Sequence, residues 1–279
     1  MQTVLTIAGF DPSSGAGVTA DLMVFAAHGL FGTACITALT VQSTLGVQST
    51  HPVESSVVAE TLECLYEDLP PAGIKIGMLG AVNNILIICS YLEQLKRQHE
   101  KQKQAVVVLD PVLRSSSGRE LVDPAGVAVI RDKMLPLVDW ITPNLEELGI
   151  LVDRQLAVRE DVPVACRELQ TRVKESSGHS LGIFATGGHL EPPDDFVLQH
   201  DGVEFWLPGE RVLTRSTHGT GCALSSAFLC NLVMGNDHVQ AATAAKSYVS
   251  GALKTAKGHG SGNSPLNHLW PIINPIISS

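Results

Sequence analysis

A glycine-rich segment at 216–222 stands directly before an apolar run at 223–229 that has the composition of a buried helix. Its two glycines allow backbone N–H groups to converge where that helix would begin. The first N–H groups of a helix are unpaired and the helix dipole is positive there, so such an end binds anions. We interpret four residues as an anion hole for a phosphoryl group: Gly219, Thr220, Gly221 and Cys222.

Cys222 is the reactive side chain of this segment. It falls in the first turn of the expected helix, where the helix dipole would lower the pKa of a thiol. A thiol in that place is a candidate base or hydrogen-bond acceptor for a substrate hydroxyl. The alternative is a glycine turn before an ordinary core helix, with Cys222 a small buried residue. Short glycine motifs alone do not decide between the two.

A second glycine-rich loop lies near the N-terminus. Residues 3–8 are predicted to form a buried strand, 9–17 a flexible loop and 18–29 a helix. The loop lacks the Gly-Lys-Ser/Thr of a phosphate-binding loop, and its glycine spacing does not fit a dinucleotide fingerprint. Asp11 inside the loop would repel a pyrophosphate. The loop is therefore expected to hold a neutral, hydroxyl-bearing substrate.

Both loops belong to a larger ordered set of motifs. The set occupies 8–17, 20–22, 37–48, 75–79, 108–112, 141–147, 187–189 and 218–222. In these blocks the chain resembles the hydroxymethylpyrimidine/phosphomethylpyrimidine kinases, the thiamine-biosynthesis branch of the ribokinase superfamily. The resemblance implies a ribokinase-like three-layer α/β/α sandwich and a homodimer. It also implies phosphoryl transfer from ATP, with Mg²⁺, to 4-amino-5-hydroxymethyl-2-methylpyrimidine and to its monophosphate.

Five residues are expected at the substrate end of the site. The first loop supplies Gly9 and Asp11, and the resemblance adds that Asp21 hydrogen-bonds the aminopyrimidine and that Met78 borders its ring. Gln42 carries an amide donor and an amide acceptor, which suit the ring nitrogen and amino group of a pyrimidine. Structural alternatives exist: Asp21 as a favourable charge near a helix N-terminus, Gln42 as a cap at a strand end, and Met78 as core filler.

Two carboxylates are expected near the polyphosphate. Asp110 ends the apolar run 106–109, and a carboxylate at the tip of a buried strand is costly unless it is paired or binds a metal. Glu147, with Asn144, reproduces the Asn-x-x-Glu motif of the superfamily. Because magnesium keeps much of its water shell, we expect both carboxylates to bind it through water. Asn144 is also placed to cap the helix that follows, and the two roles are compatible.

The nucleotide end is expected from Asn144, Thr186 and Lys246. In the family a lysine at the position of Lys246 approaches the nucleotide, although a solvated helix lysine is an ordinary alternative. Family members usually carry lysine directly before Gly-Gly-His, whereas this chain has Thr186 there. Thr186 offers only a hydroxyl. Either the metal and the 219–222 turn supply the positive potential, or nucleotide affinity and rate are reduced.

Composition excludes some partners. The formal net charge of −9 argues against nucleic acid and anionic membrane surfaces, because both need a basic face. Six scattered cysteines without a Cys-x-x-Cys pair are typical of a reduced protein, and no signal region or long apolar run appears, so we expect a soluble, cytoplasmic protein. The ten histidines lack metal spacing, so we interpret His189 and His218 as structural or nucleotide-lining.

Strands and helices alternate along the chain. Strands are predicted at 3–8, 33–40, 73–78, 105–110, 139–142, 181–186, 195–200 and 203–207. Helices are predicted at 18–29, 54–68, 81–102, 124–136, 144–152, 161–176, 220–235 and 238–257. This order implies an α/β protein with a mostly parallel sheet covered on both faces. Asp201-Gly202 predicts an antiparallel pair at one edge.

Domain organisation and site location follow from this order. With 279 residues, 44% of them hydrophobic, the chain can bury a large core, and we expect one kinase domain over 1–279. Ligands of such sheets bind at the carboxyl ends of the strands. The loops after the predicted strands would therefore open on one rim and face the 219–222 turn.

Three other functions stay open. A pyridoxal kinase would share this fold, and pyridoxal is also a flat heteroaromatic with a hydroxymethyl group; a substrate panel separates the two. A pyrimidine-binding protein without turnover is motivated by Thr186, and it would bind the pyrimidine without consuming ATP. A sugar kinase is the least favoured, because that branch usually has aspartate where Cys222 stands.

Overall fold

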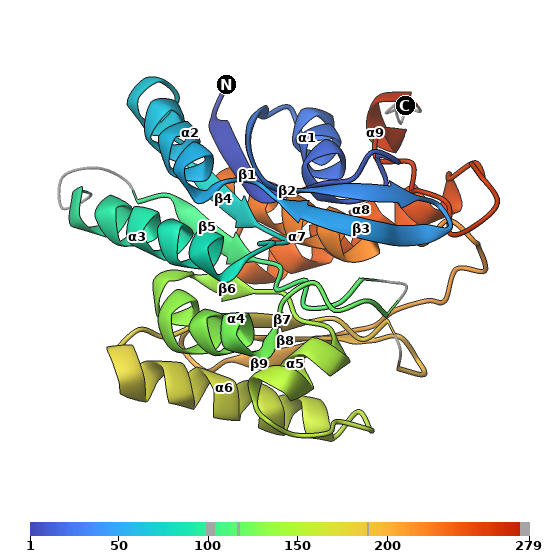
Figure 1. Cartoon of the computed structure of the whole chain (residues 1–279). Coiled ribbons are helices and arrows are strands. Elements are labelled where there is room, and N and C mark those ends of the chain that lie inside the picture. Colours follow the sequence, from blue (N-terminus) through green and yellow to red (C-terminus); the bar gives the residue numbers. More distant parts are fainter. Residues whose placement is uncertain (99–103, 116–117, 189, 274–279) are drawn as a thin grey trace.

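A nine-stranded sheet runs through the computed structural model, which describes residues 1–98, 104–115, 118–188 and 190–273 (Figure 1). The strands stand in the spatial order β3-β2-β1-β4-β5-β6-β7-β8-β9. Their bounds are β1 (Thr3–Phe10), β2 (Phe31–Ser43), β3 (Gly46–Pro52), β4 (Gly73–Ile76), β5 (Val106–Leu109), β6 (Trp140–Ile141), β7 (Gly182–Ala185), β8 (Asp195–Leu198) and β9 (Glu204–Leu207).

The sheet is parallel from β2 to β7 and antiparallel at both edges. The predicted hairpin is confirmed, because β8 and β9 pair antiparallel and Gly202 takes the positive φ of a tight turn. The other edge differs from the prediction. There β2 continues to Ser43 and pairs with β3, so Gln42 lies inside a strand.

The sequence of β3 explains why it was not predicted. Its residues, Gly46–Pro52, are mostly polar, and only Val47 is an apolar strand former. Their burial pattern lacks a fully buried position, as in an edge strand that packs no side chain into a core. Pairing with the longer β2 therefore places this segment in the sheet.

Helices cover both faces of the sheet (Figure 1). Their bounds are α1 (Gly17–Ala27), α2 (Ser55–Asp68), α3 (Val82–Gln98), α4 (Pro124–Val129), α5 (Leu145–Leu151), α6 (Asp161–Ser177), α7 (Thr220–Val233), α8 (His238–Lys254) and α9 (Trp270–Ile273). In the described part of the chain, no helix is both long and apolar enough to cross a bilayer. The predicted helix at 81–102 extends beyond the described residues at 99–102, and the expectation for His189 also falls outside them.

Two hydrophobic cores lie on opposite faces of the sheet, and β1 contributes to both. Val4 packs with α1, α7 and α8, whereas Leu5 and Ile7 pack with the layer of α2, α3 and α6. Burial on both faces explains the nearly continuous apolar sequence of β1. The predicted three-layer α/β/α architecture is confirmed.

The predicted helix at 124–136 is interrupted. After α4 the chain forms one π-helical turn over Ile130–Met134 and one 3-10 turn over Leu135–Leu137. Pro136 lies in the second turn, and proline has no N–H to continue an α-helical ladder. The interruption lies between β5 and β6 in the sequence and does not alter their parallel pairing.

Candidate active site

The chain changes direction in the sheet at β1, whose neighbours are β2 and β4. In open α/β sheets ligands bind outside the carboxyl ends of strands at such a switch point. Gly9 at the end of β1 and Met78 after β4 meet there, because a Cβ on Gly9 would lie 2.9 Å from the Met78 sulfur. Both predicted substrate residues therefore lie together at the expected rim.

The two glycine-rich loops are in direct contact. Gly219 has φ +88°, and a Cβ on it would lie 1.8 Å from the Gly15 carbonyl oxygen. No side chain fits in this space, and the positive φ also favours glycine. The turn predicted to bind a phosphoryl group therefore packs against the loop predicted to hold the substrate.

Helix α7 begins as the sequence predicts. Gly219 is its N-cap residue and Thr220 its first residue, so Thr220, Gly221 and Cys222 form the first turn. Thr220 makes one long backbone bond to Thr217, and the N–H groups of this turn precede the helical ladder. The turn thus has the backbone geometry of an anion site.

The Cys222 sulfur lies between two helix N-termini. It accepts a hydrogen bond from the backbone N–H of Gly17, the first residue of α1, and it belongs to the first turn of α7. Burial nevertheless raises the pKa of the Cys222 thiol to about 12, with the carboxylates of Asp110 and Asp21 adding to the rise and Lys75 opposing it. The lowered pKa expected for Cys222 is therefore wrong, because desolvation raises the pKa more than Lys75 and the Gly17 N–H lower it.

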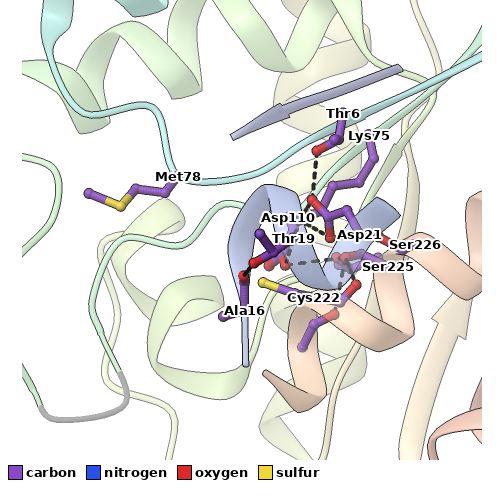
Figure 2. A network of polar contacts seen from close by, with 12 residues as sticks. Thr6, Ala16, Thr19, Asp21, Lys75, Met78, Asp110, Cys222, Ser225 and Ser226 are labelled. Atoms are coloured by element: carbon purple, nitrogen blue, oxygen red, sulfur yellow. Dashed lines mark hydrogen bonds and ion pairs between the residues drawn. The ribbon is translucent and has the colours of Figure 1, made fainter. Parts of the chain in front are cut away.

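A buried polar network lies beneath this turn, and Lys75 is at its centre (Figure 2). The Lys75 ammonium lies 3.0 and 3.1 Å from the two carboxylate oxygens of Asp21, and neither side chain has exposed surface. Thr6 and Ser226 also donate to Asp21, at 2.6 and 2.8 Å. The aminopyrimidine contact that the resemblance implies for Asp21 would require this pair to open.

Lys75 also faces Asp110, which is held at the end of β5 near Cys222. Its ammonium lies 3.8 Å from Asp110 Oδ2, and Ser225 donates to the same oxygen at 3.2 Å. Burial raises the pKa of Asp110 although the charge of Lys75 opposes the rise. Burial alone would lower the pKa of Lys75, but the charge of Asp21, followed by Cys222 and Asp110, raises it. The lysine is therefore the resident cation of this network.

Glu147 and Asn144 form a capping box at the start of α5. Asn144 accepts from the backbone N–H of Glu147 at 3.0 Å, and Glu147 accepts from that of Asn144 at 2.9 Å. A second N–H, from Leu113, reaches Glu147 at 3.2 Å after Val112 takes an unusual positive φ. The predicted cap is confirmed. Burial, and then the charge of Asp110, raise the pKa of Glu147 to about 8.

Asp110 and Glu147 carry the carboxylate oxygens that are expected to bind magnesium through water. Besides burial, the charge of Asp110 raises the pKa of Glu147, a repulsion that a nearby cation would relieve. In the described ranges no cluster of three or more His, Cys, Asp or Glu side chains is positioned to hold a metal ion. A protein cage for the ion is thus missing there, and magnesium commonly binds through one or two carboxylates plus substrate phosphates.

Asp11 organises the first loop. Its carboxylate accepts from the N–H groups of Ser13, Gly15 and Ala16 and from the Ser13 hydroxyl. His218 Nε2 adds a contact at 2.7 Å. Burial would raise the pKa of Asp11, but the bonds from His218 and Ser13 lower it below its ordinary value. The Asp11 carboxylate, which we expected to repel a pyrophosphate, is thus hydrogen-bonded on both oxygens within the protein.

The nucleotide-end residues lie on the other half of the sheet. Thr186 follows β7 and forms a parallel bridge with Asn144, so these two predicted residues are adjacent. Lys246 donates to Asp195 at 2.6 Å and to two backbone carbonyls at 3.2 Å. Asp195 also accepts from the Gly187 N–H at 2.8 Å. Through Asp195, Lys246 therefore holds the backbone of the loop that follows Thr186.

Sequence reasoning missed the roles of Lys75, Ser225 and Ser226. A lysine between apolar residues in a four-residue buried strand was the available signal, because lysine is almost never fully buried unless it is paired. The two serines carried no such signal within an apolar helix. His218 was interpreted as structural or nucleotide-lining, and its contact with Asp11 in the first loop fits the structural interpretation.

A cavity of about 480 Å³ lies away from this site. It is at the opposite ends of the strands, since Val106 and Trp140, which line it, are the first residues of β5 and β6. The chemistry-bearing residues meet at the carboxyl ends instead. The candidate site is therefore the rim between the two glycine loops.

Comparison with known proteins decides the family. The phosphomethylpyrimidine kinase family model matches residues 11–267, which include most of the first glycine loop, Lys75 and the 219–222 turn. The chain belongs to the phosphomethylpyrimidine kinase family.

Relatives within this family align along nearly the whole chain. A hydroxymethylpyrimidine/phosphomethylpyrimidine kinase of Aquifex aeolicus is 37% identical over 262 residues, which cover 92% of this chain and 96% of the relative. A thiamine biosynthesis bifunctional protein of Geobacter sulfurreducens is 34% identical over 271 residues, and the chain spans about half, 52%, of that longer protein.

Solved structures of two kinds of kinase resemble the fold. A phosphomethylpyrimidine kinase of Clostridium difficile has a TM-score of 0.75 at 28% identity, covering 90% of this chain and 98% of that chain. The pyridoxal kinase of Staphylococcus aureus in complex with ADP has a TM-score of 0.83 at 26% identity, covering 99% and 96%. The ribokinase-like fold expected for the phosphomethylpyrimidine kinase family is thus confirmed.

Proposed function

We propose that this protein transfers the γ-phosphoryl group of ATP to 4-amino-5-hydroxymethyl-2-methylpyrimidine and to its monophosphate, in thiamine biosynthesis. The observation that carries the proposal is the contact between the two glycine loops at Gly15 and Gly219, within a chain of the phosphomethylpyrimidine kinase family. One loop belongs to the substrate end and the other to the phosphoryl end. A hydroxymethyl group held by the first loop would face the phosphoryl group held by the second.

The chemistry at this junction is an in-line displacement. The hydroxymethyl oxygen forms a bond to the γ-phosphorus, the bond from that phosphorus to ADP breaks with its electron pair staying on ADP, and the hydroxyl proton passes to the solvent. The backbone N–H groups of Gly219, Thr220, Gly221 and Cys222 stabilise the charge on the transferred group. Because its pKa is raised to about 12, the Cys222 thiol is neutral and its sulfur serves as a hydrogen-bond acceptor for the hydroxyl.

The substrate ring is assigned to Gly9, Gln42 and Met78. Gly9 and Met78 are in contact at the end of β1. The side-chain nitrogen of Gln42 lies 3.1 Å from Nε2 of His218, which contacts the first loop. Gln42 supplies the amide donor and acceptor for the aminopyrimidine edge. Asp11 and Asp21 contribute from behind, the first by shaping the loop and the second by holding Lys75.

The nucleotide end is assigned to Asn144, Thr186 and the loop braced by Lys246. Asp110 and Glu147 would hold magnesium through water, and the ion supplies charge neutralisation on the transferring phosphates when bound. Lys75 keeps Asp110 at the end of its strand, beside the first turn of α7. Thr186 offers only a hydroxyl at the position before Gly187 and Gly188, so the α7 turn carries more of the phosphate charge.

A pyridoxal kinase is the second candidate, favoured by the high structural similarity to the Staphylococcus aureus enzyme. The family match and the named relatives at 33–37% identity favour the pyrimidine. A pyrimidine-binding protein without turnover is the third candidate, and Thr186 motivates it. The three candidate functions differ in which compound, if any, the protein phosphorylates with ATP.

The test is ADP release with hydroxymethylpyrimidine, its monophosphate and pyridoxal in parallel. We expect turnover with both pyrimidines, a fall in kcat of about a hundredfold in Cys222→Ala, and a smaller fall in Cys222→Ser, which keeps an acceptor. Pyridoxal as the best substrate would replace the assignment. Pyrimidine binding without ADP release would establish the binding protein.

We also propose a homodimer, a cytoplasmic location and a single domain. A homodimer is supported by family resemblance and by the exposed apolar side chains of Leu39, Val41 and Leu45 around β2. Sedimentation tests it. Cell fractionation tests the cytoplasmic location, and limited proteolysis tests the single domain over 1–279.

A further inference from the structure

The C-terminal segment 262–268 lies between the elements that carry the candidate site and precedes α9 (Figure 1). It contacts the first loop, the residues that lead into α7 and the turn that follows β2. The substrate and phosphoryl ends are assigned to these parts of the chain. A single segment from the far end of the sequence therefore joins them.

His268 holds the first loop at Gly15. Its Nε2 atom lies 3.1 Å from the Gly15 carbonyl oxygen, and because a carbonyl only accepts, Nε2 carries the hydrogen. Burial holds the pKa of His268 below its ordinary value, although the bond to Gly15 and the charge of Asp21 oppose the shift, so the ring is neutral. Nδ1 is buried without a partner among the described residues. The bond to Gly15 is thus the one that fixes the imidazole there.

The Gly15 peptide is the point where the two glycine loops meet. Asp11 Oδ2 accepts from the Gly15 N–H at 3.2 Å, so Asp11 and His268 hold the N–H and the carbonyl of the same residue. A Cβ on Gly219 would lie 1.8 Å from this carbonyl oxygen. A shift of the carbonyl therefore moves the first loop against the turn that opens α7.

The same C-terminal segment holds the chain just before α7. The Ser264 carbonyl accepts from the backbone N–H of His218 at 3.1 Å, and the Ser264 N–H donates to the Arg215 carbonyl at 3.0 Å. Pro265 and His218 form a parallel bridge. Ser264 and His268 belong to one segment, so both glycine loops are tied to the same piece of backbone.

Segment 262–268 is itself anchored at both ends. At its start, Asn263 donates its backbone N–H to the Thr44 carbonyl at 2.9 Å, directly after β2 ends. A Cβ on Gly262 would lie 2.0 Å from that carbonyl oxygen. At the other end, the Tyr248 hydroxyl of α8 donates to the His268 carbonyl. The segment is therefore fixed between β2 and α8.

We propose that segment 262–268 is a positioning frame for the two loops, and that His268 acts within it by holding the Gly15 carbonyl, which sets the distance between the first loop and the α7 turn. This inference rests on the proposed transfer of a phosphoryl group across that junction. A misplacement of about 1 Å at reacting atoms can lower a rate about a hundredfold. Loss of the His268 bond should therefore lower kcat and leave the KM values for the pyrimidine and ATP within about twofold.

A matched pair of amide variants tests the reach of the donor. The side-chain nitrogen of glutamine lies as many bonds from Cβ as His268 Nε2 does, whereas that of asparagine lies one bond closer. In His268→Asn we expect kcat to fall at least about tenfold, and in His268→Gln to stay within about threefold of the wild type. Both variants are assayed at a temperature where circular dichroism shows them folded. Equal kcat values in the two variants would overturn the proposal.

Two glycine variants test the frame without changing the histidine. Gly262→Ala places a Cβ 2.0 Å from the Thr44 carbonyl oxygen and must displace the segment, whereas a Cβ on Gly258 would meet only the Ser264 hydroxyl oxygen, at 3.8 Å. We expect kcat to fall at least about fivefold in Gly262→Ala and to stay unchanged in Gly258→Ala. Wild-type kcat in both variants would contradict a positioning frame.

Hydrogen exchange separates this inference from the proposed function. In His268→Asn we expect the amides of 9–17 and 216–222 to exchange at least about fivefold faster, with those of β4 unchanged and with His268→Gln like the wild type. An equal rise throughout the chain would indicate a merely structural histidine and overturn the proposal. If the wild type transfers no phosphate, the kinase assignment fails, while the exchange pattern still decides whether His268 holds the two loops.

Discussion

The Lys75 ammonium lies within 3.0 and 3.1 Å of both carboxylate oxygens of Asp21, and neither side chain has any exposed surface. This buried ion pair connects β4 to α1 beneath the first turn of α7, where we propose that the phosphoryl group binds (Figure 2). Gly77 makes room for it, since a Cβ there would lie 2.8 Å from the ammonium. The pair therefore links the stability of the sheet centre to the geometry of the site.

Removing one partner of this pair should be strongly destabilising. Lys75→Met leaves Asp21 buried without its cation, which costs about 3–5 kcal/mol. The melting temperature should fall by at least about 6 °C for a chain of this size. Thermal denaturation followed by circular dichroism measures this, and a fall of less than about 2 °C would contradict it.

The double variant Lys75→Met/Asp21→Asn separates stability from function. Removing both charges should restore most of the melting temperature, because neither charge is then left unpaired. The kcat should stay low, because Asp110 has still lost the cation 3.8 Å away that holds it near Cys222. Wild-type kcat in the refolded double variant would show that Lys75 serves stability alone.

Alkylation of Cys222 should be slow at neutral pH. The thiolate is the reactive form, and a pKa of about 12 leaves almost none of it at pH 7. The rate with iodoacetamide should rise about tenfold per pH unit to beyond pH 10. The experiment uses a Cys64→Ser background, because Cys64 is exposed, and follows the modified peptide by mass spectrometry. A plateau near pH 7 would instead support a thiolate held by the helix dipole.

Glu147 should make stability depend on pH. Its folded pKa is about 8, above the ordinary value of 4.5, so the folded state binds more protons than the unfolded state between these values. Stabilisation is then fully present below about pH 4.5 and is lost as pH rises to about 8. Relative to Glu147→Gln, the wild type should lose melting temperature across this window. A constant difference between the two proteins would contradict the raised pKa.

Thr186→Lys should improve nucleotide binding. Thr186 bridges Asn144 at the proposed nucleotide end, and a lysine there would add a positive charge beside the polyphosphate. We expect the KM for ATP to fall up to about fivefold, the size of a partly exposed charge interaction, with the KM for the pyrimidine unchanged. Thr186→Gln is the neutral control of similar length. An equal improvement in both variants would exclude a charge effect.

Much of the fold was predictable because apolar strands and amphipathic helices alternate from β1 onward. The hairpin of β8 and β9 also followed from Asp201-Gly202. β3 was not predictable from apolar periodicity, because its stability comes from pairing with β2 at an edge. The local sequence pattern predicts well which residues are buried. It predicts poorly which polar segments pair their backbone with a neighbouring strand.

The site was predictable in its loops and less so in its interior. Gly219 and Gly9 mark close approaches that only glycine allows, and the sequence displays such positions directly. The contacts of Asp21 depend on Lys75, which is 54 residues away and becomes its neighbour only in the sheet. The pKa of Cys222 likewise depends on burial by distant elements rather than on its own helix.

The most direct test follows the γ-phosphate of labelled ATP into products identified by mass spectrometry. We predict that hydroxymethylpyrimidine becomes its monophosphate and then its diphosphate, with kcat/KM above that for pyridoxal. Label transferred to pyridoxal in preference to both pyrimidines, or no transfer to any of the three compounds, would contradict it.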